Sequence, residues 1–226
     1  RRGKIIVPAF ALGRTQELVY ILHQLVDAHE IPPLQIFIDS PLAVNLSDVF
    51  SRRREDFDLQ TWHDFSRPGE TPLAFRSLTY TRSVQESKDL NRRPGPFVVI
   101  SASGMCEAGR IRHHLFNGLA DPRNVVMVTG FMAANTLGRR LVEGAREVRI
   151  FDRRIRVRAE VEVFNEFSAH ADGADLQSYA EHVPGLANVF LVHGKADQAE
   201  GLRQHLATAH PSWQVALAVR GKTVTV

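Results

Sequence analysis

Two of the ten histidines lie where an imidazole can take part in catalysis or bind a metal. His170 stands in the segment Phe167 to Asp172, between an alternating strand-like segment and a helix-like one. His193 follows the apolar run Val189 to Val192 and precedes Gly194, again where a strand leads into a helix. Ligands and catalytic groups of α/β sheets gather at the carboxyl ends of strands. For either histidine alone, a hydrogen-bonded structural role is favoured; with both at such an edge, a functional site and a structural role are equally favoured.

The sequence does not contain a complete metal site that can be recognised from spacing. A catalytic zinc needs about three protein ligands that converge on one point, and neither His-x-His nor His-Glu-x-x-His occurs. His113 and His114 are adjacent, so on a helix they point about 100° apart and make poor joint ligands. The single cysteine, Cys106, excludes an internal disulfide and a cysteine-based zinc site. The remaining histidines fall on predicted helix surfaces or in loops: His23, His29, His63, His182, His205 and His210.

Short apolar runs that alternate with helix-like segments place the catalytic candidates in an α/β protein. Most of these runs are bounded by Gly, Pro, Ser or Asp and followed by a helical pattern. Continuous apolar strands of this kind are typical of a largely parallel sheet that helices cover on both faces. The runs are Lys4 to Val7, Leu34 to Ile38, Phe97 to Ile100, Val125 to Val128 and Val189 to Val192.

Two regions depart from this pattern. From Ile155 to Val163, apolar residues alternate strictly with Arg and Glu, which predicts one half-exposed strand. We expect a change of sheet or domain near this segment. Residues 50–93 have no strong period and contain breakers such as Arg67-Pro68-Gly69, so short helices and a surface excursion are expected there.

The composition limits the class of protein and of partner. No apolar run reaches the roughly 18 to 20 residues that span a bilayer, and one cysteine fits a reducing compartment, so a cytoplasmic protein without membrane contact is expected. The net charge is only +3, yet 24 of the 28 basic residues are Arg. Arginine grips phosphate through a planar fork, which is compatible with a nucleic-acid partner. A biased genome composition explains the same usage equally well.

Five motifs in a fixed order resemble the β-CASP branch of the metallo-β-lactamase superfamily, in particular bacterial RNases similar to the pre-mRNA 3′-end cleavage endonuclease. Each motif alone is common in proteins, whereas their order along nearly the whole chain is specific. The motifs are IVPAFALGRTQE at Ile6 to Glu17, IDSPLA at Ile38 to Ala43, SASGM at Ser101 to Met105 with Gly109-Arg110, SAHAD at Ser168 to Asp172, and LVHG at Leu191 to Gly194.

The resemblance implies a division of the chain into two domains. Residues 1–150 correspond to most of a β-CASP domain, and residues 151–226 to the carboxy-terminal segment that completes a metallo-β-lactamase αββα domain. The family's zinc-binding His-x-His-x-Asp-His motif does not occur here. We therefore expect this chain to be an incomplete portion of the enzyme, inactive on its own.

The resemblance also implies roles for individual residues. His170 is expected beside the scissile phosphate as the catalytic residue, and His193 as the last ligand of a site that holds two zinc ions. Lys195 stands where relatives often have an acidic residue, which puts the support of His193 by a neighbouring group in doubt. Substrate phosphates are expected to contact five residues: Ser168, Ser101, Ser103, Gly104 and Arg110. A tight turn at Ser101 to Gly104 and a helix-surface ion pair of Arg110 are the alternatives.

The function implied by the resemblance is zinc-dependent phosphodiester hydrolysis of RNA by an endo- or exoribonuclease. Single-stranded RNA is the expected partner, and a homodimer is possible within the family. A non-catalytic nucleic-acid-binding module or pseudo-enzyme subunit is the alternative. A DNA nuclease of the superfamily fits less well, because such relatives tend to have Val at the position of His193.

Overall fold

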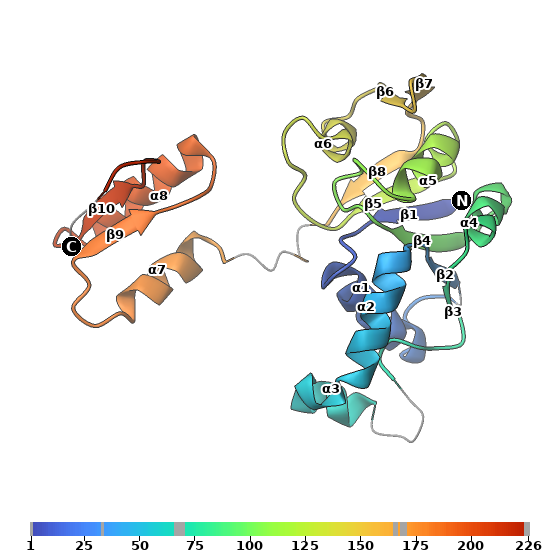
Figure 1. Ribbon diagram of the computed structural model, residues 1–226, viewed down its shortest axis with the longest axis horizontal. Helices are drawn as coiled ribbons and strands as arrows, with labels where there is room; N and C mark the ends of the chain where they lie inside the picture. The colour runs from blue at the N-terminus through green and yellow to red at the C-terminus, as the bar shows by residue number, and fades with distance from the viewer. Residues whose placement is uncertain (1, 33, 66–70, 165–166, 168–170, 224–226) are drawn as a thin grey trace. The chain divides into compact units, whose positions relative to one another are not determined.

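The computed structural model describes the chain except for residues 1, 33, 66–70, 165–166, 168–170 and 224–226 (Figure 1). The chain divides into two compact units, residues 1–168 and residues 169–226, and each is described by itself. The strands of the larger unit are β1 (Lys4–Pro8), β2 (Gln35–Ile38), β3 (Leu78–Tyr80), β4 (Phe97–Ser101), β5 (Val125–Val128), β6 (Glu147–Ile150), β7 (Arg153–Arg156) and β8 (Glu160–Val163). Its helices are α1 (Arg14–Asp27), α2 (Pro41–Arg52), the 3-10 turn η1 (Arg54–Asp56), α3 (Leu59–Asp64), α4 (Val84–Arg92), α5 (Ile111–Gly118) and α6 (Leu137–Val142).

The larger unit is organised around a parallel sheet whose described strands follow the order β3-β2-β4-β1-β5-β8. All adjacent pairs in this sheet are parallel, and both Val7 of β1 and Ile38 of β2 pair with Ile100 of β4. The predicted α/β class, with a largely parallel sheet between helices, is confirmed for this unit. The carboxyl ends of β1, β2 and β4 therefore meet at one edge.

Alternate residues of the central strands enter two cores on opposite faces of the sheet. Ile6 and Val99 belong to the core on which α4, α5 and α6 pack, whereas Val7 and Ile100 belong to the core under α1 and α2 (Figure 1). Because side chains of a strand point alternately to the two faces, a run that is apolar at every position is what a sheet covered on both sides requires. This explains why the apolar runs were visible in the sequence.

The segment predicted as one alternating strand from Ile155 to Val163 forms two strands in different sheets. β7 pairs antiparallel with β6, and β8 pairs parallel with β5 at the edge of the main sheet. Between them, the amides of Arg158 and Ala159 both donate to the carbonyl of Leu119. These contacts with a distant segment interrupt the strand, so the prediction of one continuous strand is wrong and the expected change of sheet is present.

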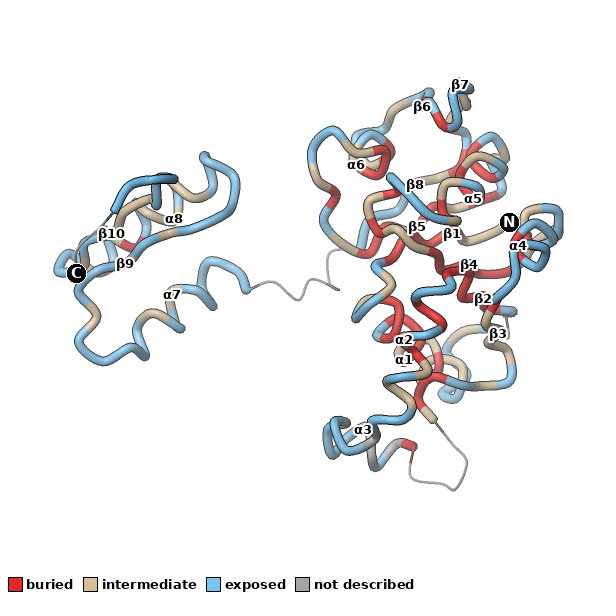
Figure 2. Tube along the Cα trace, viewed as in Figure 1, coloured by how far each residue is buried: buried red, intermediate tan, exposed pale blue. Residues whose placement is uncertain are grey.

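The smaller unit contains α7 (Gly173–Glu181), β9 (Asn188–Leu191), α8 (Ala196–Ala209) and β10 (Gln214–Leu217), with β9 parallel to β10. Asp172 caps α7: its carboxylate accepts from two amides of the first turn, and Asp175 accepts from the amide of Asp172. Among the described residues of this unit only Leu206 is buried, and Tyr179 of α7 is 77% exposed. Figure 2 accordingly shows the unit mostly in the colours of intermediate and exposed residues.

The domain boundary predicted between residues 150 and 151 stays a prediction; the chain divides into its two compact units between residues 168 and 169. Residues 50–93 contain the expected short helices, together with the strand β3, which the sequence pattern did not indicate. No helix in the described part of the chain combines the length and the apolar character needed to cross a bilayer.

Candidate functional site

The loop from Ser101 to Arg110 connects the carboxyl end of β4 to α5 and is folded back on itself. Ser101 is buried, and its hydroxyl donates to the carbonyl oxygen of Asp39 at 2.7 Å. The hydroxyl oxygen of Ser103 accepts from the amides of Glu107 and Ala108, both at 3.2 Å. Both hydroxyls thus hold the loop in shape. Their predicted contact with phosphate stays a prediction.

Glycine is required at two positions of this loop because neighbouring atoms leave no room for a side chain. A Cβ atom on Gly104 would lie 2.9 Å from the ring of Phe10, and one on Gly109 would lie 2.3 Å from the carbonyl oxygen of Ala102. Gly109 also has a φ of 75°, a conformation that other residues rarely adopt. The tight turn left open by the sequence is therefore present, and Gly104 itself is buried.

Arg110 ends this loop and forms an ion pair with a carboxylate that is fully buried. Its Nη1 atom lies 2.8 Å from Oδ1 of Asp39, and its Nη2 atom donates to the carbonyl of Arg82 at 3.1 Å. Asp39 stands directly after β2, where Ser40 caps α2 and Pro41 occupies its first turn. The ion pair therefore joins the end of β2 to the start of α5. Arg110 does form an ion pair, but its partner is a buried carboxylate and not a residue on the helix surface, as the alternative supposed.

Two further side chains complete the set of donors around Asp39. His114 Nε2 lies 2.7 Å and the Ser87 hydroxyl 2.6 Å from Oδ2 of Asp39. Since a carboxylate only accepts, the Nε2 atom of His114 carries the proton. Burial favours the neutral acid, but the hydrogen bonds from His114, Ser87 and Arg110 outweigh it and lower the pKa of Asp39. Asp39 is thus held as a buried anion.

Sequence reasoning missed this buried cluster of Asp39, Ser87, Arg110 and His114. His114 was rejected as a metal ligand because it is adjacent to His113, and Asp39 was considered only as part of the IDSPLA motif. A usable signal was present, since Arg110 and His114 are four residues apart and share one helix face. Asp39 comes from the end of an adjacent strand, and parallel strands end at one edge of the sheet.

His193, the predicted metal ligand, is among the residues that the structure describes. It lies two residues after β9, is exposed and has a φ of 71°. Its exposed imidazole fits the role of a single zinc ligand. Among the described residues, however, no three His, Cys, Asp or Glu side chains come close enough to bind a metal. The described residues therefore do not form a zinc site by themselves, and they do not define a reaction step at zinc.

The motif that contains Ser168 and His170 lies outside the described residues. The described residues that follow begin with Ala171 and the helix cap at Asp172. The predicted contacts of Ser168 and His170 with phosphate therefore stay predictions.

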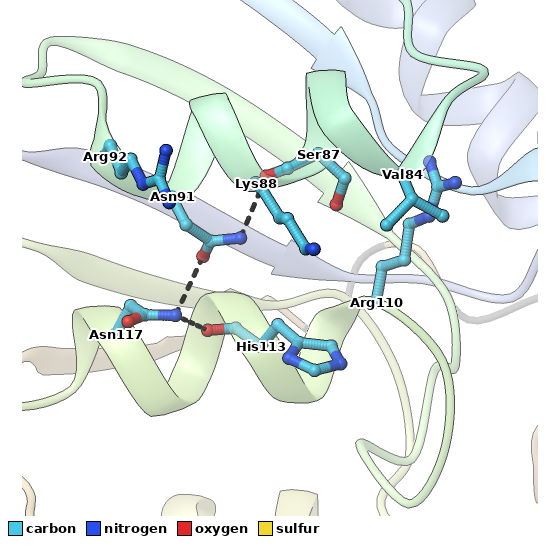
Figure 3. A pocket seen from close by; sticks show the side chains of 8 residues that line it. All are labelled: Val84, Ser87, Lys88, Asn91, Arg92, Arg110, His113 and Asn117. Carbon is cyan, nitrogen blue, oxygen red and sulfur yellow. Dashed lines mark hydrogen bonds between the residues drawn. The ribbon is translucent and has the colours of Figure 1, made fainter.

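A polar cavity of about 430 Å³ lies between α4 and α5, close to the ion pair of Arg110 (Figure 3). The side chain of Lys88 extends from α4 toward His113 of α5, and Asn91 accepts a hydrogen bond of 3.2 Å from Asn117. The residues that line the cavity are Val84, Ser87, Lys88, Asn91, Arg92, Arg110, His113 and Asn117. None of these is a carboxylate.

Comparison with known proteins assigns a family to both parts of the chain. Residues 15–141 match the model of the Beta-Casp domain, and residues 154–218 match that of the Zn-dependent metallo-hydrolase RNA specificity domain. The buried cluster lies in the first region and His193 in the second.

Curated relatives match along most of this chain. Ribonuclease TTHA0252 of Thermus thermophilus is 34% identical over 224 residues, which are 99% of this chain and 50% of that protein. The RNase J-like protein of Methanocaldococcus jannaschii is 30% identical over 87% of this chain and 44% of its own length. The cleavage and polyadenylation specificity factor subunit 3-I of Arabidopsis thaliana is 29% identical, over 92% and 29%.

The chain thus spans half or less of the length of these relatives. The Beta-Casp model alone matches more than half of the 226 residues, and its match includes four strands of the parallel sheet, β2 to β5. The resemblance seen in the motifs is confirmed: the chain belongs to the β-CASP family of metallo-β-lactamase proteins.

Proposed function

We propose that these 226 residues form part of a zinc-dependent ribonuclease that hydrolyses RNA phosphodiester bonds. The observation that carries the proposal is the pair of family matches, the second of which is to a Zn-dependent metallo-hydrolase RNA specificity domain and includes His193. The names of two relatives support it, since one is called a ribonuclease and the other an RNase J-like protein.

In this proposal His193 is one ligand of a site for two zinc ions, and the other ligands come from residues outside the described set. Zinc, when bound, polarises the phosphate and lowers the pKa of an attacking water. The contribution of this chain is an imidazole at the carboxyl end of β9, exposed and free to approach a metal. Lys195, at the start of α8, offers no carboxylate to orient that imidazole.

The proposed role of His170 is to donate a hydrogen bond or proton to the phosphate or the leaving oxygen, with Ser168 as a further donor. An imidazole suits this role because its ordinary pKa lies near neutrality. The loop from Ser101 to Gly104 is proposed to face phosphate mainly through its backbone, because the hydroxyls of Ser101 and Ser103 are already bonded within the protein. Arg110, which lines the cavity between α4 and α5, is also proposed to contact phosphate.

The proposed substrate is single-stranded RNA, and the proposed location is the cytoplasm, with a homodimer as the proposed assembly. The free, buried thiol of Cys106 supports a reducing compartment. Sedimentation of the purified chain at several concentrations tests the dimer.

The test uses a polypeptide that contains these residues together with the family's His-x-His-x-Asp-His motif. His193→Ala removes a metal ligand and is expected to lower zinc content and RNA cleavage together. His170→Ala removes a proton or hydrogen-bond donor and is expected to keep zinc while slowing cleavage by about 10² to 10⁴-fold. The control is His205→Ala, which alters an exposed histidine bonded to Gln177 and should keep both properties.

A substrate with an activated leaving group separates the two roles of His170. If this imidazole protonates the leaving oxygen, His170→Ala should lose much less rate on the activated substrate than on ordinary RNA. Equal losses would assign it to phosphate positioning instead. RNA binding without any cleavage by the unaltered, zinc-loaded polypeptide would replace the ribonuclease with a non-catalytic RNA-binding module.

A further inference from the structure

The cavity between α4 and α5 is bordered by one face of each helix. On α4, residues 84, 88 and 91–92 recur at the spacing of one helix face. On α5 and the residue before it, 110, 113 and 117 do the same. The hydrogen bond between Asn91 and Asn117 crosses from one helix to the other and holds the two faces together (Figure 3). The cavity is thus a fixed feature of the packed helices.

The charge in this cavity is positive. Lys88 and Arg92 are exposed, and Lys88 forms no ion pair with another described residue. Arg92 faces Asp89 on its own helix at 3.8 Å, but both side chains are more than half exposed, so water and salt screen this contact. The charge of Arg110 is offset by Asp39. Two cations therefore remain to attract an anion.

A second basic cavity continues from the first. Its volume is about 300 Å³, and Asn91, Arg92 and Asn117 line both cavities. Its one lining carboxylate, Asp121, is already held by the guanidinium of Arg123, which lowers the pKa of Asp121 to about 2. The cations that line it are Arg2, Lys4, Arg92, Arg93 and Arg123. The two cavities form an elongated basic groove, named here the α4–α5 groove.

The shape and chemistry of the groove fit a chain of phosphate groups. Lys88 and Arg92 are one turn apart on α4, about 6 Å along the helix axis, so they can contact different groups of one extended polyanion. The lining residues of both cavities include no Phe, Tyr or Trp, and the one imidazole among them, that of His113, already packs against the ring of Phe151. Charge without stacking favours contact with the backbone over reading of the bases.

We propose that the α4–α5 groove binds the phosphate backbone of single-stranded RNA, with Lys88 and Arg92 contacting two phosphate groups. This inference rests on the proposed function, because it names a surface by which the same protein holds its RNA. It adds residues that neither the family motifs nor the predicted phosphate contacts contain, apart from Arg110.

The test measures binding of a fluorescent oligouridylate to the 226-residue chain as a function of salt. Each phosphate contact to a single strand contributes about 0.7 to the slope of log K against log salt. Lys88→Ala with Arg92→Ala should therefore reduce the slope by about 1.4 and weaken binding about 25-fold at 0.1 M salt. Circular dichroism verifies that the exposed substitutions leave the fold intact.

Two control variants separate a phosphate site from general charge. Lys88→Arg with Arg92→Lys keeps both cations and should keep the slope. Arg52→Ala with Arg76→Ala removes two exposed cations elsewhere on the larger unit and should leave the slope unchanged. An equal loss in this last variant would overturn the proposal, since it would show that only net charge matters.

Other outcomes also decide the question. Adenosine monophosphate and inorganic phosphate should compete only weakly, because each offers one phosphate group to a groove that holds several. Competition by either as strong as by the oligonucleotide would overturn the RNA assignment in favour of a small phosphate ligand. If the unaltered chain binds RNA and the Lys88/Arg92 variant binds it equally, only this inference fails. If the unaltered chain binds no RNA, the proposal that these 226 residues bind RNA is refuted as well.

Discussion

Replacing Asp39 by Asn tests the buried cluster at the ends of β2 and β4, because it removes the charge while keeping the shape. In the wild-type protein Asp39 is fully buried and receives hydrogen bonds from His114 and Ser87 at Oδ2 and from Arg110 at Oδ1. An Asn side chain offers one acceptor oxygen and one NH₂ donor in place of two acceptors. If the amide nitrogen faces Arg110, two donors meet; if it faces His114 and Ser87, both of these must change from donor to acceptor. In either orientation the guanidinium of Arg110 loses its carboxylate partner.

The expected loss is about 3 kcal/mol of unfolding free energy at neutral pH, the lower end of the range for removing one partner of a buried ion pair. The lower end applies because Arg110 still donates to the carbonyl of Arg82 and its side chain is 16% exposed. Asp48→Asn is the matched control. Asp48 pairs with Arg82 at 3.0 Å on the surface, and its loss should cost less than about 1 kcal/mol.

The pH dependence follows from the lowered pKa of Asp39. A carboxyl group whose pKa is lower in the folded state contributes stability above its unfolded pKa of about 3.9, and loses it as the pH falls through the folded value. The difference between wild type and Asp39→Asn should therefore be equal at pH 7 and pH 5 and shrink below about pH 4. Urea denaturation followed by circular dichroism measures both quantities. A loss at pH 7 no larger than that of Asp48→Asn would refute the reasoning.

Three further predictions concern other parts of the structure. Gly109→Ala should cost roughly 1–3 kcal/mol more than Gly144→Ala in urea denaturation, because both glycines have a positive φ but only Gly109 lies against a backbone oxygen. The thiol of Cys106 is buried and its pKa is raised to about 12, so it should react with a thiol reagent only as fast as the protein unfolds; rapid labelling of the folded chain would contradict its burial. The 226-residue chain should keep no stoichiometric zinc after dialysis against a mild chelator, since His193 is its one recognisable described ligand; elemental analysis that finds one or more ions per chain would show that a complete site exists.

The parts of the fold that were predictable from sequence are those that local pattern determines. The run at Phe97 to Ile100 is apolar at every position because β4 lies inside a sheet covered on both faces, and this pattern needs no knowledge of distant residues. In contrast, β3 has only three residues, Leu78 to Tyr80, which is too short for a period to be seen. The break between β7 and β8 depends on hydrogen bonds to Leu119, about forty positions away, and no local pattern contains them.

The same distinction applies to the candidate site. His193 was recognisable from its place after a strand, whereas the partners of Asp39 come from α4 and from α5 with the residue that precedes it. Arg110 and His114 are 71 and 75 positions from Asp39, so the pairing becomes visible only when the strand order is known. The sequence pattern predicted which residues lie at the edge of the sheet, and the structure shows which of them form hydrogen bonds and ion pairs with one another.

The place of β1 between β4 and β5 has a consequence for synthesis on the ribosome. β1 is translated before both of its described neighbours, and the nearer of these along the chain, β4, begins at Phe97, 93 residues after Lys4. At translation rates of about 5–20 residues per second, the ribosome needs roughly 5 to 19 s to extend the chain from β1 to β4. During that interval the apolar strand has two unpaired edges, which are templates for pairing with other chains. The nascent chain before β4 emerges therefore exposes an apolar strand that is open to aggregation and to chaperone binding.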